Sequence, residues 1–130
     1  MVTEVQVTWS SSNSTTLLAN TSSTSDEFNI TTKTARIELK ADNQSPSPQT
    51  NDVIYIWLLE TSGDPDGAST DEFTTTGHAE LLAVLKTFED NPAIESLELP
   101  LPHKGAKLYA DGQSAGTSNI IHVSATITTD

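Results

Sequence analysis

The sequence contains no cysteine, which excludes a disulfide framework, a thiolate metal site and a cysteine nucleophile. Its three histidines stand far apart, and it has no phosphate-binding loop, no Gly-x-Ser-x-Gly turn and no metal-ligand spacing. These absences remove the reaction types that are most readily recognised from a sequence. We therefore expect no catalytic residues and no cofactor, and we expect a binding or structural role.

Basic residues are also few, because six Lys and Arg stand against 18 Asp and Glu, giving a formal net charge of −12. This charge repels phosphate groups, so we expect no binding to nucleic acid and no attachment to anionic membranes. No apolar run approaches the roughly 20 residues needed to cross a bilayer. Residues 1–8 carry Glu4 and no basic segment followed by an apolar one, so we expect no signal peptide and assembly in a cytoplasm.

Serine and threonine are abundant, at about a quarter of the chain, and threonine suits the half-buried surface of a β-strand. The length of 130 residues is that of one domain with one core. We expect residues 1–130 to form a single β-sandwich domain.

Alternation of apolar and polar residues predicts the strands, most clearly at residues 34–42 and 121–127, each with one core face and one solvent face. Residues 53–59 are unbroken apolar sequence, which predicts a central strand covered on both faces. Shorter apolar or alternating segments lie at residues 5–9, 17–19, 28–30, 94–99 and 107–111.

One segment has a helical pattern, because Leu81, Val84, Leu85 and Phe88 recur at i, i+3, i+4 and i+7. This spacing predicts a short amphipathic helix around residues 77–88. The remaining turn signals recur at intervals of about 8–12 residues, as in sandwiches and jelly rolls. The predicted fold class is all-β, an antiparallel β-sandwich or jelly roll of about eight strands with this one helix.

The connection that follows the central strand is acidic. Carboxylates supply the oxygen ligands that Ca²⁺ prefers, but a proline interrupts their alternation and no acid closes the loop at its twelfth position. We expect a solvated acidic loop with no bound metal, and calcium binding is the alternative. The candidate ligands are Asp64, Asp66, Asp71 and Glu72.

His103, Lys104 and Lys107 form a basic cluster in the second half of the chain. They could dock an acidic surface of a neighbouring copy, or they could protect a strand edge from unwanted pairing. Trp9 and Trp57 fall on predicted core faces, so we expect them to pack in the core, with a sugar-stacking platform as the alternative.

The chain resembles small virion proteins of tailed bacteriophages, in particular capsid decoration (cement) proteins and other accessory β-sandwich proteins. Residues 3–10, 71–79 and 104–109 and the threonine-rich last strand carry the resemblance. It implies a non-enzymatic protein that binds the major capsid protein or another virion protein on the outer shell, commonly as a homotrimer. A tail, connector or fibre component and a carbohydrate-binding or adhesive surface domain are the alternatives.

Overall fold

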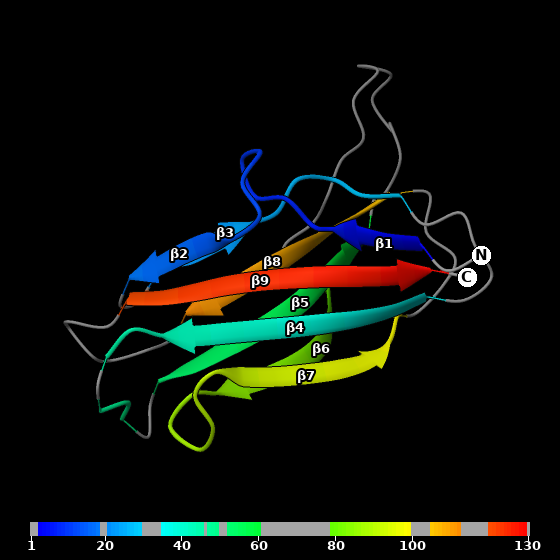
Figure 1. The fold of residues 1–130 in the computed structure, drawn as a ribbon. Helices are drawn as coiled ribbons and strands as arrows, with labels where there is room; N and C mark the ends of the chain where they lie inside the picture. Colours follow the sequence, from blue (N-terminus) through cyan, green and yellow to red (C-terminus); the bar gives the residue numbers. More distant parts are fainter. Residues whose placement is uncertain are drawn as a thin grey trace.

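The computed structural model describes residues 3–18, 21–29, 35–45, 47–49, 52–60, 79–99, 105–112 and 120–129. Nine strands lie in these ranges and form two antiparallel sheets packed face to face, with no helix in the described part (Figure 1). The prediction of an all-β sandwich is confirmed. The strands are β1 (Thr3–Gln6), β2 (Thr15–Leu18), β3 (Ser22–Thr24), β4 (Ala35–Asn43), β5 (Val53–Glu60), β6 (Ala79–Lys86), β7 (Ala93–Glu98), β8 (Ala106–Gly112) and β9 (Ile120–Thr129).

The strand order is that of a jelly roll. The first sheet runs β1-β9-β4-β7 and the second runs β3-β8-β5-β6. Both β1 and β2 pair with β9, opposite residues 126–129 and 120–123 respectively, so they are two parts of one interrupted edge strand. With β1 and β2 counted as one, eight strands are divided between the two sheets in jelly-roll order.

The core lies between the two sheets, where the alternation of the sequence places it. Every second side chain of β4 is buried, and so is every second side chain of β9 from Ile121 to Ile127, with exposed fractions of 3 % or less. Each Ile, Leu or Val buried in this way contributes about 1.5–3 kcal/mol to folding. The core residues of these two strands are Ala35, Ile37, Leu39, Ala41, Ile121, Val123, Ala125 and Ile127.

The helix predicted around residues 77–88 is wrong, because residues 79–86 form strand β6. Leu85 faces the core, whereas Leu81 and Val84 pair with outward-facing residues of β5. A β-bulge in the pairing of β5 with β6 gives β6 one extra residue and shifts its alternation. Leu81 and Val84 lie outward on either side of the bulge, and Leu85 faces inward. Their spacing of three and four residues is therefore the same as on one face of an amphipathic helix.

A buried polar network closes one end of the sandwich. Thr87 Oγ1 donates to the backbone oxygen of Asp52 at 2.9 Å and accepts from Asn43 Nδ2 at 3.1 Å. Asn91 exchanges two hydrogen bonds, of 2.9 and 2.8 Å, with the backbone of Asn43. The side chains of Asn43, Asp52 and Thr87 are each at most 3 % exposed. The network therefore ties the end of β4, the start of β5 and the turn between β6 and β7 together.

Candidate functional site

Lys107 is the one described residue among the site residues predicted from the sequence. Calcium binding by the acidic loop and docking through the basic cluster therefore stay predictions. The others lie outside the described residues: Asp64, Asp66, Asp71, Glu72, His103 and Lys104.

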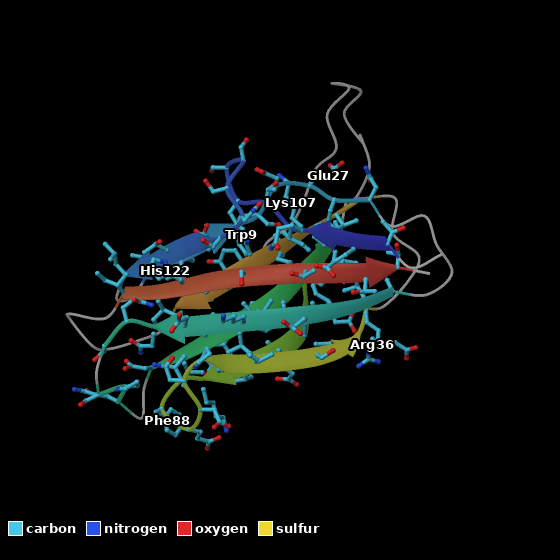
Figure 2. The ribbon with its side chains drawn as sticks, in the orientation of Figure 1. Trp9, Glu27, Arg36, Phe88, Lys107 and His122 are labelled. Carbon is cyan, nitrogen blue, oxygen red and sulfur yellow. The ribbon has the colours of Figure 1, made fainter. Side chains whose placement is uncertain are left out.

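Lys107 is half-buried on β8, and its positive charge acts on Asp26 of the same chain (Figure 2 labels Lys107). The pKa of Asp26 is lowered, first by a hydrogen bond from the backbone N–H of Ser11 and then by one from the Thr8 hydroxyl. The two donors lie 2.9 and 2.7 Å from Asp26 Oδ2, and the charge of Lys107 adds a smaller effect. The positive charge of Lys107 thus interacts with Asp26 of its own chain.

The Asp26 carboxylate holds a tight turn of unusual backbone geometry. Ser10 and Ser11 have φ values of 48° and 69°, a region that residues other than glycine rarely adopt. Trp9 and Ser12 on either side exchange backbone hydrogen bonds of 2.6 and 2.9 Å. The hydrogen bond from Ser11 to Asp26 therefore helps to fix a turn that its own sequence does not favour.

Trp57 lies on the outer face of the second sheet. The prediction that it packs in the core is therefore wrong. Its neighbours Ile56 and Leu58 are fully buried, whereas Trp57 is half-buried, as expected from the alternation of a strand. On β8 the residue opposite Trp57 is Tyr109, which is also half-buried. Trp9, in contrast, is 3 % exposed, and its predicted place in the core is confirmed.

The outward side chains of β5, β6 and β8 together form a surface that we call the aromatic face. Trp57 pairs with Leu81 of β6, which is 44 % exposed, and Tyr55 pairs with Val84. On the outer side of β5, Tyr55 and Trp57 are half-buried, whereas Leu59 is 1 % exposed. The predicted cover on both faces is therefore found at Leu59 but not at Tyr55 and Trp57. The aromatic face consists of Tyr55, Trp57, Leu81, Val84 and Tyr109.

The outer face of the first sheet has a different chemistry. The central strand β9 presents Ser124, Thr126 and Thr128, flanked on β4 by charged residues that include Arg36. His122 lies at the other end of this face from Arg36, with Nδ1 3.0 Å from Thr16 Oγ1 (Figure 2). The middle of this face is hence hydroxylated and charged, with exposed apolar side chains at Leu18 and Ile120 at one end and at Ile94 on the edge strand β7. The outer face of the second sheet is aromatic and aliphatic along β5 and β6.

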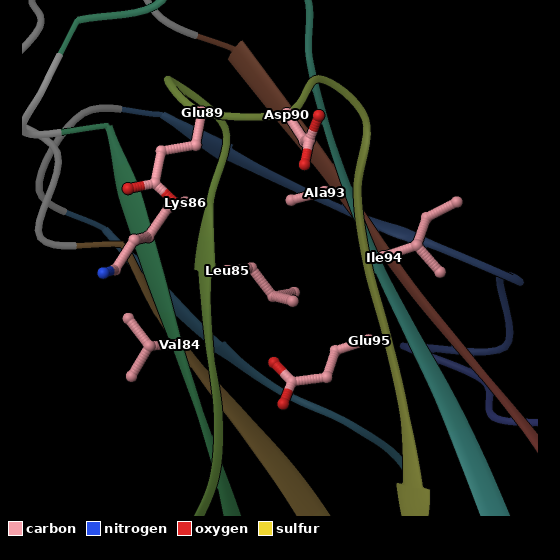
Figure 3. A pocket seen from close by; sticks show the side chains of 8 residues that line it. All are labelled: Val84, Leu85, Lys86, Glu89, Asp90, Ala93, Ile94 and Glu95. Carbon is pink, nitrogen blue, oxygen red and sulfur yellow. The ribbon is translucent and has the colours of Figure 1, made fainter.

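An open groove of about 280 Å³ lies between the edge strands β6 and β7 (Figure 3). Its carboxylates favour a positively charged group. Within the described ranges, however, no three His, Asp or Glu side chains are arranged to hold a metal ion. The groove is lined by Val84, Leu85, Lys86, Glu89, Asp90, Ala93, Ile94 and Glu95.

Sequence reasoning missed the aromatic face, although part of the signal was present. Lys107, Tyr109 and Asp111 share one parity of β8, and two charged residues on that parity indicate the solvent side. In β5 both parities are apolar, so the pattern alone did not distinguish the side of Trp57 from the side of Ile56.

Comparison with known protein families finds no family model that matches this sequence, and comparison with curated proteins finds no match either. The described part of the chain contains no helix long and apolar enough to span a membrane. Functional inference therefore depends on the fold and on the chemistry of the two outer faces.

Proposed function

We propose that this chain is a non-enzymatic structural protein of a tailed-bacteriophage virion, specifically a capsid decoration protein that stabilises the outer shell as a homo-oligomer. The observation that carries the proposal is the aromatic face, an apolar surface on the outside of a small acidic domain. The proposal is supported by the resemblance of the sequence to cement proteins. The jelly-roll order also fits, since viral capsid domains use this architecture, although other functions share it.

The composition of the aromatic face fits contact with protein. Tyr and Trp are enriched in the cores of protein interfaces and supply much of the binding energy there, while charged residues are depleted. Trp57 and Tyr109 lie opposite each other at the centre of this face, with Leu81 beside Trp57. Such a group of side chains gains hydrophobic free energy when a partner covers it.

The proposed mechanism is adhesive. Each copy buries apolar and polar surface across a joint between shell subunits, and many linked contacts convert modest affinity into durable attachment. The hydroxyl groups of Ser124, Thr126 and Thr128 can add hydrogen bonds on the other side of the sandwich. A net charge of −12 keeps free copies away from the DNA in the infected cell.

Carbohydrate binding is the second candidate function, and the outward position of Trp57 favours it. Aromatic rings on an open sheet face can stack on sugar rings. A sugar also needs hydrogen-bond partners beside the rings, and the pairing partners of Trp57 and Tyr55 on β6 are the aliphatic Leu81 and Val84. On β8, Lys107 and Asp111 flank Tyr109 on the same face. The β6 side of this neighbourhood favours a protein partner, and the polar groups of β8 suit either partner.

Cosedimentation tests the proposed function. Purified protein is mixed with empty shells of the phage whose genome encodes it and centrifuged, and the pellet is quantified over a range of protein concentrations. We expect saturable binding with a fixed number of copies per shell. Protein that stays in the supernatant, together with its absence from purified particles, would rule out the decoration role.

A further inference from the structure

We infer that the aromatic face is the surface on which a second copy of this chain docks. The inference rests on the proposed function, because a decoration protein that acts as an oligomer needs a contact between copies. It names the side of the sandwich at which that contact forms. The outer face of the first sheet is then left for the shell.

The first argument is that the apolar groups of the aromatic face are contiguous, whereas the first sheet exposes Leu18 and Ile120 at one end and Ile94 separately on the edge strand β7. Leu81 is 44 % exposed, and Tyr55, Trp57, Val84 and Tyr109 are all half-buried on one continuous set of paired strands. Contiguous apolar surface of this kind is unfavourable in water and is typical of an interaction site.

The second argument is charge. The outward residues of β6 and β8 include Lys86, Lys107 and Asp111, two bases and one acid with a formal sum of +1. Copies that each carry −12 repel one another, and they do so least where the local charge is balanced. The outer face of the first sheet has a formal sum of −2, from four acids and two bases: Glu4, Glu38, Asp42, Glu98, Arg36 and Lys40.

A glycan and a shell protein are the two other possible partners of the aromatic face, and they fit it less well. A glycan would find polar groups on the β8 side of the rings, at Lys107 and Asp111, but only aliphatic pairing partners on the β6 side, at Leu81 and Val84. A shell protein could bind an apolar face, but the small local charge of this face, +1 against −12 for the whole chain, provides a reason for two acidic copies to meet there. Both remain distinguishable outcomes of the experiment.

The test is sedimentation-velocity analysis of the full chain and of two matched variants. Leu81→Lys places a charge on the aromatic face, and Ile94→Lys places the same charge on β7 of the first sheet, where Ile94 is 56 % exposed. We expect the wild type and Ile94→Lys to form the same oligomer at concentrations up to about 100 μM. Leu81→Lys should raise the dissociation constant by about tenfold or more.

Tyr109→Lys is the second variant for the aromatic face, and circular dichroism checks that each variant folds. A monomeric wild type at about 100 μM would overturn the inference. So would an oligomer that Leu81→Lys and Tyr109→Lys leave intact, or one that Ile94→Lys disrupts instead. Because shell binding is measured separately, a monomer that still cosediments with shells would refute this inference and the homo-oligomeric state, and would leave the decoration role standing.

Two further measurements distinguish a shell protein and a glycan as the partner of the aromatic face. Empty shells added to a monomeric chain would show docking to the shell if Leu81→Lys, and not Ile94→Lys, abolished cosedimentation. Xylo- and cello-oligosaccharides would show glycan binding if they changed the fluorescence of the wild type but not of Trp57→Ala. Either result would contradict docking of a second copy on this face.

Discussion

Asp26 shows how one side chain fixes a turn that its local sequence does not favour. Its carboxylate accepts hydrogen bonds from the Ser11 backbone and the Thr8 hydroxyl, and Ser10 and Ser11 have positive φ values. Both hydrogen bonds favour the charged carboxylate, which is why its pKa is lowered in the folded protein.

Replacement of Asp26 by Asn should reduce stability in a pH-dependent way. A carboxyl group whose pKa is lower in the folded state stabilises the protein above the unfolded pKa of about 3.9. That contribution is lost as the pH falls through the lowered folded pKa. Thermal melts should thus show a lower Tm for Asp26→Asn at pH 7 and a smaller difference at pH values below about 4. Asp90→Asn, at an exposed position, is the control that removes the same charge. A difference that is constant with pH would refute this account.

Trp9 carries a different cost, since its buried Nε1 has no hydrogen-bond partner within the described part of the structure. An unpaired buried donor costs about 1–3 kcal/mol, so Trp9→Phe removes that cost while losing some packing volume. We expect the free energy of unfolding to change by less than about 1 kcal/mol in Trp9→Phe and to fall by about 3–5 kcal/mol in Trp9→Ala. Denaturant titration measures both. A large loss in Trp9→Phe would indicate that the indole N–H is paired.

At the scale of elements, the sequence predicted strands best where one face is apolar and the other polar. Strands β4 and β9 follow their alternation residue by residue. Strand β6 did not, because Leu81 and Val84 belong to the aromatic face and a bulge shifts the alternation relative to Leu85. A bulge depends on the pairing partner β5, and this information is not contained in the local pattern of β6.

The aromatic face, too, could be predicted only where apolar and polar residues alternate along a strand. The outward side of β8 could be predicted from its two charged residues, but the outward side of β5 could not, because Tyr55 and Trp57 alternate with equally apolar residues. Long-range pairing with β6 and β8 decides which side faces the other sheet. The aromatic face is therefore a property of the assembled sheet and not of one segment.

The polar network at the end of the sandwich makes a prediction for the turn after β6. Thr87→Val keeps the shape of the side chain but removes the hydroxyl that bonds to Asp52 and Asn43. We expect a loss of about 1–3 kcal/mol, because one buried N–H of Asn43 Nδ2 loses its acceptor, while the Asp52 backbone oxygen keeps the 3.3 Å hydrogen bond from the Thr87 N–H. Thr128→Val, at an exposed position of β9, should change stability by less than about 0.5 kcal/mol. Equal effects of the two substitutions in denaturant titration would contradict this role of Thr87.

At the scale of the whole molecule, charge and apolar surface oppose each other. Copies with a net charge of −12 repel, while the aromatic face attracts. Added salt screens the repulsion and leaves apolar contacts in place, so self-association should strengthen between about 0.02 and 0.5 M NaCl. Sedimentation at several salt concentrations measures this. Dissociation by salt would instead indicate that ion pairs hold the copies together.

The central claim is that Trp57 lies on the outside of the sandwich and is covered when copies assemble. Acrylamide quenching of the Trp9→Phe variant tests it most directly, because Trp57 is then the sole tryptophan. The account predicts that Trp57 is readily quenched in dilute solution, and that quenching falls and emission shifts to the blue as concentration rises. Protection of Trp57 at every concentration, as for a core residue, would contradict the claim.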